Sequence, residues 1–174
     1  MRRRNVVLAV AVLAAGLLVA SLASATDGKK NVKSDELTGY QENPDVSSTG
    51  TGSFRATIDD DAQTITYELS YSAIEGGDAF AAHIHFGKRA VNGGVSAFLC
   101  GGGDKPACPA TAGTVTGVID AADIVGPAGQ GIEPGSFDEL VAAIRAGHTY
   151  VNVHSPRWPG GEIRAQINDR DADN

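Results

Sequence analysis

Three of the four histidines in this 174-residue chain stand in two short segments that can place them on one surface. The segments are His83-Ile84-His85 and Tyr150-Val151-Asn152-Val153-His154. Alternate side chains of an extended strand point to opposite faces, so each segment separates its histidines from its aliphatic residues. Imidazole nitrogens suit zinc and copper, and three histidines with a free fourth position form a recognised catalytic zinc arrangement. If the two strands are neighbours, His83, His85 and His154 are predicted to hold a copper or zinc ion.

Four further polar residues lie where they would surround such an ion. Tyr150 and Asn152 share the face of His154, and Glu162 and Arg164 share one face of the next predicted strand. Ligand histidines are commonly oriented by hydrogen bonds from a second layer of groups, a role that we assign to Asn152 and Glu162, with Tyr150 packed beside them. If the ion is copper and exposed, Arg164 is expected to attract a small anion.

Two other interpretations of the histidines stay open. The same residues with Asn152 would also form a hydrogen-bonded network that joins two strands without any ion, since buried polar groups need partners. An open-site copper or zinc metalloenzyme is the third interpretation. His148 lies six residues before His154, roughly 20 Å along an extended strand, and is expected to be exposed. The chain has no nucleophile elbow, P-loop or dinucleotide fingerprint, so we predict a binding module rather than an enzyme.

Alternating apolar residues predict the elements that position these side chains. The clearest case is a hairpin in which residues 50–58 and 64–71 flank a polar turn. Shorter strands are predicted over residues 35–41, 80–86, 95–99, 113–119, 149–154 and 162–167. With 22 glycines and many short strands, the fold class is all-β, a Greek-key-like antiparallel β-sandwich of about seven to nine strands.

One short capped helix is predicted near residues 137–146. Ser136 and Glu139 have the spacing of a capping box, and Gly147 is a typical C-terminal stop. The apolar residues of this segment, Phe137, Leu140, Val141 and Ile144, form one stripe at helical spacing.

The N-terminus has the features of an export signal. Three arginines precede an apolar run that ends in Ala23-Ser24-Ala25, so residues 1–25 are predicted to be a signal peptide, and the chain to be secreted, periplasmic or at the cell surface. An uncleaved membrane anchor is the alternative, because the run approaches the length of a spanning helix. Residues 26–36 are predicted to be a flexible lead-in, and residues 169–174 a disordered tail.

The two cysteines support the same compartment. Cys100 and Cys108 enclose seven residues, and in an exported protein they are predicted to form a disulfide bond. The formal net charge of −7 argues against a nucleic-acid partner, because phosphate binding needs clustered Lys and Arg. An extracellular protein or a glycan is the kind of partner that remains.

Several of these segments together resemble the CHRD domain, which is named for its occurrence in chordin and is also found as a stand-alone exported protein. The resemblance is carried by the segments 37–42, 50–52, 82–87, 146–155 and 159–167. It implies one domain over residues 37–168 and an exported binding module whose ligand is unassigned. The His-x-His strand is also similar to a copper-ligand strand of copper/zinc superoxide dismutases, so the metalloenzyme interpretation would be of that type. The resemblance also implies a fourth histidine ligand, which His148 is too distant to supply, and fold analogy alone does not assign an activity.

Overall fold

The structure is a computed structural model that describes residues 28–168. The predicted signal peptide and the predicted C-terminal tail lie outside the described residues. The strands are β1 (Lys29–Ser34), β2 (Leu37–Thr38), β3 (Thr51–Asp59), β4 (Thr64–Ser72), β5 (Ala81–Phe86), β6 (Gly94–Cys100), β7 (Gly113–Ile119), β8 (Thr149–His154) and β9 (Ile163–Asn168). The helices are α1 (Phe137–Arg145) and the short 3-10 turns η1 (Gly39–Gln41), η2 (Ala121–Asp123) and η3 (Ala128–Gln130).

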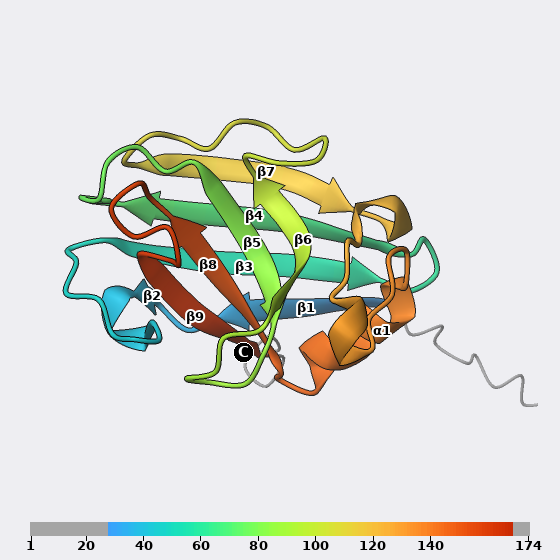
Figure 1. The fold of residues 1–174 in the computed structure, drawn as a ribbon. Helices are drawn as coiled ribbons and strands as arrows, with labels where there is room; N and C mark the ends of the chain where they lie inside the picture. The colour runs from blue at the N-terminus through green and yellow to red at the C-terminus, as the bar shows by residue number, and fades with distance from the viewer. Residues whose placement is uncertain (1–27, 169–174) are drawn as a thin grey trace, which may run out of the picture.

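The strands form two layers that cross face to face. Their pairing order is β6-β5-β8-β9-β1-β3-β4-β7, and every pair is antiparallel. Figure 1 shows β5, β6, β8 and β9 running across β1, β3, β4 and β7. Hydrogen-bonded pairing continues from one layer to the other where β9 pairs with β1 over two residues. β2 pairs with both β3 and β9 at the same corner. The predicted antiparallel β-sandwich is therefore confirmed.

The apolar core lies between the two layers. In the β3–β4 hairpin the buried side chains alternate with polar ones as predicted, and Phe54 and Leu69 face each other across the pair. Ile84 and Val151 enter the same core from the other layer. The Tyr67 hydroxyl donates to the Leu99 carbonyl at 2.6 Å and so joins β4 to β6.

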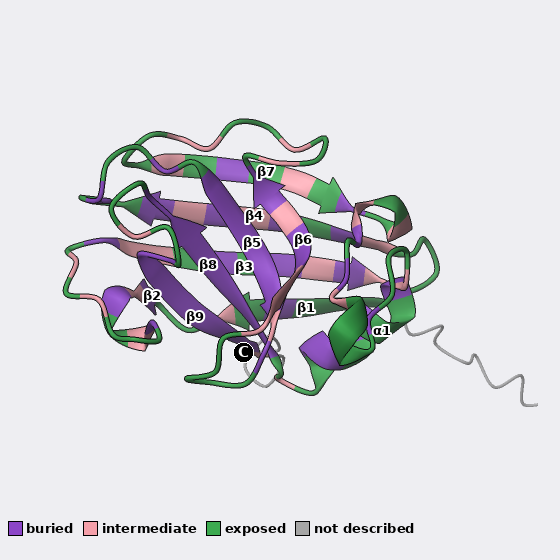
Figure 2. Ribbon diagram, in the orientation of Figure 1, coloured by how far each residue is buried: buried purple, intermediate pink, exposed green. Residues whose placement is uncertain are grey.

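The layer that carries the histidines is buried on both of its faces. Figure 2 shows β3 and β4 alternating between buried and less buried residues, whereas β8 is buried at all six positions and β5 at its first five. Loops cover the polar outer face. The backbone carbonyls of Lys88, Gly93 and Pro159 in these loops form hydrogen bonds with side chains of that face. The polar side of β8 is thus enclosed rather than solvated.

Two local predictions were wrong. Residues 26–36 are not a lead-in throughout, because Lys29–Ser34 forms β1. This strand pairs with β3 and buries Val32 beside Ala56, and a single apolar residue was too weak a sequence signal. The predicted capping box is also absent: in the described structure the Ser136 side chain makes no cap hydrogen bond. A capping box forms at η2 instead, where Asp120 and Asp123 are the reciprocal pair.

A third local prediction holds only in part, because the strand predicted over residues 35–41 is reduced to β2 (Leu37–Thr38), and Gly39–Gln41 forms the 3-10 turn η1 instead. The predictions for the helix and the cysteines agree with the structure. The helical stripe of α1 is buried, and Gly147 follows it with φ +69°, a conformation that favours glycine. Cys100 and Cys108 form the predicted disulfide, with their Cα atoms 5.0 Å apart. Within the loop that it closes, Lys105 pairs with Asp104 and Asp123 at 2.6 and 2.7 Å.

Candidate metal centre

Adjacent antiparallel strands bring the three predicted ligands together. In the β5–β8 register, His83 lies opposite Asn152 and His85 lies opposite Tyr150, and His154 follows at the end of β8. Residues two apart on a strand share a face, so the three imidazoles project from the outer face of this layer. Their potential ligand nitrogens lie within 4.8 Å of one another, and all three residues are buried. Within residues 28–168, no other group of three or more His, Cys, Asp or Glu side chains is placed to share an ion.

Backbone carbonyls determine which ring nitrogen carries the proton in two of the histidines. His85 Nδ1 lies 3.0 Å from the Gly93 carbonyl oxygen, and His154 Nδ1 lies 3.0 Å from that of Pro159. A carbonyl only accepts hydrogen bonds, so each Nδ1 must donate a proton. In a neutral imidazole the Nε2 atom then keeps a free lone pair. Metal-bound histidines typically have this arrangement, with the second nitrogen donating to a carbonyl or carboxylate.

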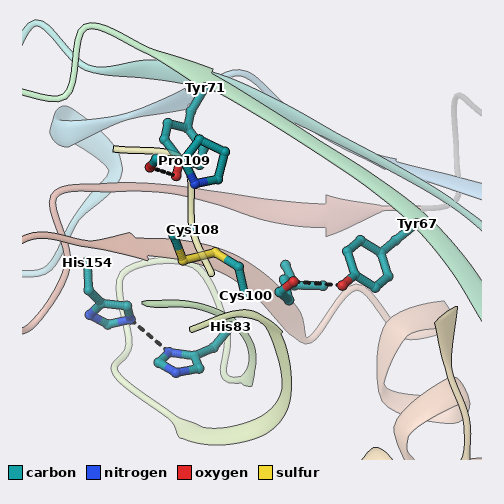
Figure 3. The surroundings of a disulfide bond; sticks show 8 residues. Tyr67, Tyr71, His83, Cys100, Cys108, Pro109 and His154 are labelled. Atoms are coloured by element: carbon teal, nitrogen blue, oxygen red, sulfur yellow. Dashed lines mark hydrogen bonds between the residues drawn. A yellow bond between two sulfur atoms is a disulfide. The ribbon is translucent and has the colours of Figure 1, made fainter. Parts of the chain in front are cut away.

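The third histidine contacts the second directly. His83 Nδ1 lies 3.0 Å from His154 Nε2, and Figure 3 shows the two rings facing each other near the Cys100–Cys108 disulfide. Because His154 Nε2 has no proton, His83 Nδ1 is the donor of this bond in the metal-free protein. Two nitrogens bound to one tetrahedral ion at zinc–nitrogen distances would be about 3.3 Å apart. The observed pair therefore needs little rearrangement to share an ion, once His83 Nδ1 gives up its proton.

One nitrogen of the cluster is buried without a partner. His85 Nε2 makes no hydrogen bond to any described residue. A buried polar atom with no partner costs free energy, so most such atoms in proteins are paired. The hydrogen-bonded network accounts for His83 and His154 but leaves His85 unsatisfied.

Burial keeps the three rings uncharged. It is the largest cause that lowers the pKa of His83 to about 3 and the pKa of His85 to about 4, and it also lowers the pKa of His154. The neighbouring histidines lower the pKa of His83 further. Near neutral pH the cluster consists of neutral imidazoles, the form that binds metal ions.

Comparison of the sequence with known protein families gives a match. The family model for the CHRD domain matches residues 34–167. The chain belongs to the CHRD family. No curated protein and no solved structure matches it. The likeness to superoxide dismutases therefore rests only on the His-x-His strand and the β-sandwich.

Tyr150 is the predicted neighbour that touches the cluster of the CHRD domain directly. Its ring stacks on His85 with centroids 4.8 Å apart and an angle of 6° between the planes. Its hydroxyl accepts a hydrogen bond from the Gly93 N–H at 3.1 Å, so Tyr150 also holds the residue whose carbonyl orients His85. Tyr150 thus positions His85 in two ways.

Arg164 contacts the loop over the outer face, and its attraction of a small anion to an exposed copper ion stays a prediction. Its guanidinium lies 3.4 Å from the centre of the Tyr150 ring, on which it forms a cation–π contact. It donates to the carbonyls of Lys88 and Val91 at 3.0 and 2.9 Å and to the Asn92 side chain at 3.3 Å. These contacts hold the loop over the outer face.

Asn152 joins a buried carboxyl group rather than a histidine. Its amide donates to the Glu42 carboxylate and to the Ile163 carbonyl, and none of its hydrogen bonds to described residues reaches the cluster. Burial raises the pKa of Glu42 to about 7, while the charge of Arg164 and the bond from Asn152 act in the opposite direction. Glu42 was not among the predicted site residues, because it follows the turn η1 and belongs to no periodic pattern.

Glu162 also has a different role from the predicted one. One carboxylate oxygen accepts from the Ser48 hydroxyl at 2.6 Å and the Glu75 N–H at 2.8 Å, and the other accepts from the Gly76 N–H at 3.2 Å. Glu162 is fully buried, so it fastens two loops to the start of β9. The prediction that it orients a ligand histidine is wrong.

Two further findings concern His148 and membrane-spanning helices. His148 is exposed and lies outside the cluster, as predicted. No helix within residues 28–168 has the length and apolar character needed to cross a membrane.

Proposed function

We propose that this chain is an exported, non-enzymatic CHRD-domain module that binds a transition-metal ion of the copper and zinc group through His83, His85 and His154. The observation that carries the proposal is the state of His85. Its Nδ1 is engaged by a backbone carbonyl, while its buried Nε2 has no partner among the described residues and belongs to a group of nitrogens within 4.8 Å. An ion would supply the missing partner.

Rigid positioning supports the proposal further. Two ligands come from one strand and the third from its direct neighbour, so sheet pairing sets their spacing before any ion binds. Carbonyls orient His85 and His154, and Tyr150 stacks on His85. When bound, the ion would be held by the Nε2 atoms of His85 and His154 and by His83 Nδ1. Preorganised ligands with fixed tautomers raise metal affinity.

Export is the second part of the proposal. It is supported by the signal-like residues 1–25 and by the Cys100–Cys108 disulfide, which is the kind of bond that persists in oxidising compartments. The match to the CHRD family is consistent with it. In such a compartment the domain would meet metal ions outside the cytosol.

The test is metal content and affinity of the full chain, purified through its own export route without a histidine tag. Inductively coupled plasma mass spectrometry and calorimetric titration with Zn(II) and Cu(II) should give one ion per chain. The His83→Ala/His154→Ala double variant should lose it. His148→Ala is the matched control, because it removes an exposed histidine outside the cluster, and it should bind as the wild type does.

Circular dichroism separates loss of metal from loss of fold. A folded wild-type chain that neither retains nor takes up either ion would refute the proposal and favour the hydrogen-bonded network. Equal metal loss in His148→Ala would also contradict it, because the ion would then be bound elsewhere or without specificity.

A further inference from the structure

The three ligands of the proposed centre carry no charge, and no acidic side chain of the described residues is placed to share the ion with them. The potential ligand set is three imidazoles, with no carboxylate or thiolate. The groups that shift the pKa values of these rings are the other histidines, Arg164 and the carbonyls of Gly93 and Pro159; among described residues no acidic group is one of them. Among the described residues, the charged group that most directly affects these rings is the guanidinium of Arg164.

The two buried acids of the described residues, Glu42 and Glu162, already have hydrogen-bond partners. The Glu42 carboxyl group accepts from Asn152 and lies within the influence of Arg164. The Glu162 carboxylate is held by Ser48 and by backbone N–H groups. Neither acid belongs to the group of side chains that can reach a shared ion.

Aromatic rings line the cluster. The Phe98 ring packs edge-on against His83 with centroids 4.6 Å apart, and the Phe80 ring lies 6.1 Å from His154. Tyr150 covers one face of His85. The three histidines are 6 to 8% exposed, so an ion bound among them would lose most of its hydration.

These surroundings discriminate between ions by charge. The free-energy cost of transferring an ion from water to a low-dielectric site rises with the square of its charge, so it is about four times larger for a divalent than for a monovalent ion. Zn(II) also prefers four ligands, and in a three-histidine site the fourth is a water molecule or a substrate. Cu(I) carries half the charge of Zn(II) or Cu(II), so its burial among three neutral imidazoles costs less free energy.

We infer that the centre is selective for monovalent copper, Cu(I), over Cu(II) and Zn(II). The inference rests on the proposed function, since it specifies which ion the three histidines hold. It makes the three-histidine centre a site for reduced copper rather than a zinc site.

The test is competitive titration of the full chain with each ion. Cu(I) is supplied without oxygen from its bicinchoninate complex, and Zn(II) and Cu(II) are titrated against chelators of known affinity. We expect one Cu(I) per chain, bound at least about tenfold more tightly than Zn(II) or Cu(II), because of the charge-dependent cost of burial. Zn(II) or Cu(II) binding as tightly as Cu(I) would overturn the inference while leaving the proposed function intact. If none of the three ions binds, both proposals fail.

A pair of variants at Phe98 tests the physical reason. Phe98 is only partly buried and is not a ligand, so the fold should tolerate a polar residue there. Phe98→Glu places a carboxylate beside His83, whereas Phe98→Gln has nearly the same shape without the charge. The ratio of Cu(I) to Zn(II) affinity should fall at least about tenfold in Phe98→Glu relative to Phe98→Gln, since an anion lowers the cost of burying a divalent ion. An equal ratio in the two variants would show that charge does not set the selectivity.

Discussion

The buried carboxyl group of Glu42 makes a quantitative prediction about stability and pH. Glu42 is 6% exposed and bonded to Asn152, and burial raises its pKa to about 7 from the ordinary value of 4.5. A carboxyl group whose folded-state pKa is raised binds its proton more tightly in the folded protein than in the unfolded chain. Its stabilising contribution is therefore complete below pH 4.5 and is lost as the pH rises through about 7. Replacing it by Gln keeps an oxygen that accepts from Asn152 and removes the ionisation.

The size of the effect follows from the difference between the two pKa values. Between pH 5 and pH 8 the wild-type domain should lose about 2 to 3 kcal/mol of unfolding free energy through Glu42 alone, at 1.36 kcal/mol per pKa unit. Glu42→Gln does not titrate, so its stability relative to the wild type should rise by that amount over this range. At pH 5 the two proteins should be nearly equally stable, because Glu42 is then protonated.

Chemical denaturation of the metal-free domain in urea, with a chelator present, measures this difference. Wild type and variant are compared at pH 5, 6, 7 and 8, so that the titration of the histidines is common to both and cancels. Glu133→Gln is the matched control, because it removes an exposed glutamate and should show no such trend. A difference between wild type and Glu42→Gln that stays constant from pH 5 to pH 8 would refute the argument that burial holds this carboxyl group protonated.

Two further perturbations test the loops around the site. A Cβ atom at Gly76 would lie 2.0 Å from the Ser155 hydroxyl oxygen, so Gly76→Ala should destabilise the domain by about 1 to 3 kcal/mol through overpacking; an unchanged urea midpoint would count against the tight packing seen there. Replacing Cys100 and Cys108 together by alanine should cost about 2 to 3 kcal/mol for so short a loop and should leave the far-ultraviolet circular dichroism of the sheet unchanged. A melting temperature equal to that of the wild type would contradict the stabilising role of the disulfide.

Strand periodicity accounts for most of what could be predicted about the fold. The β3–β4 hairpin, the strands β5 and β8 and the buried stripe of α1 all follow from alternation at period 2 or spacing near 3.6. β1 was missed because only Val32 in that segment is buried, and its stability comes from pairing with β3. The capping box was predicted at the wrong helix. The spacing of Ser136 and Glu139 is only a local sequence pattern, and in the part of the chain that the structure describes the Ser136 side chain makes no cap hydrogen bond.

For the candidate site, too, the sequence predicted some features and missed others. Histidines two apart on β5, and a third on the polar side of β8, were enough to predict that His83, His85 and His154 share a face, because side-chain direction in a strand follows from residue number alone. What they contact was decided only by the tertiary structure. Loops far apart in sequence determine that Arg164 holds a loop, that Glu162 fastens two others and that Asn152 meets Glu42. Periodicity describes each strand by itself, whereas the enclosure of this polar face, and with it the neutral state of the cluster, depends on chain segments that no local pattern brings together.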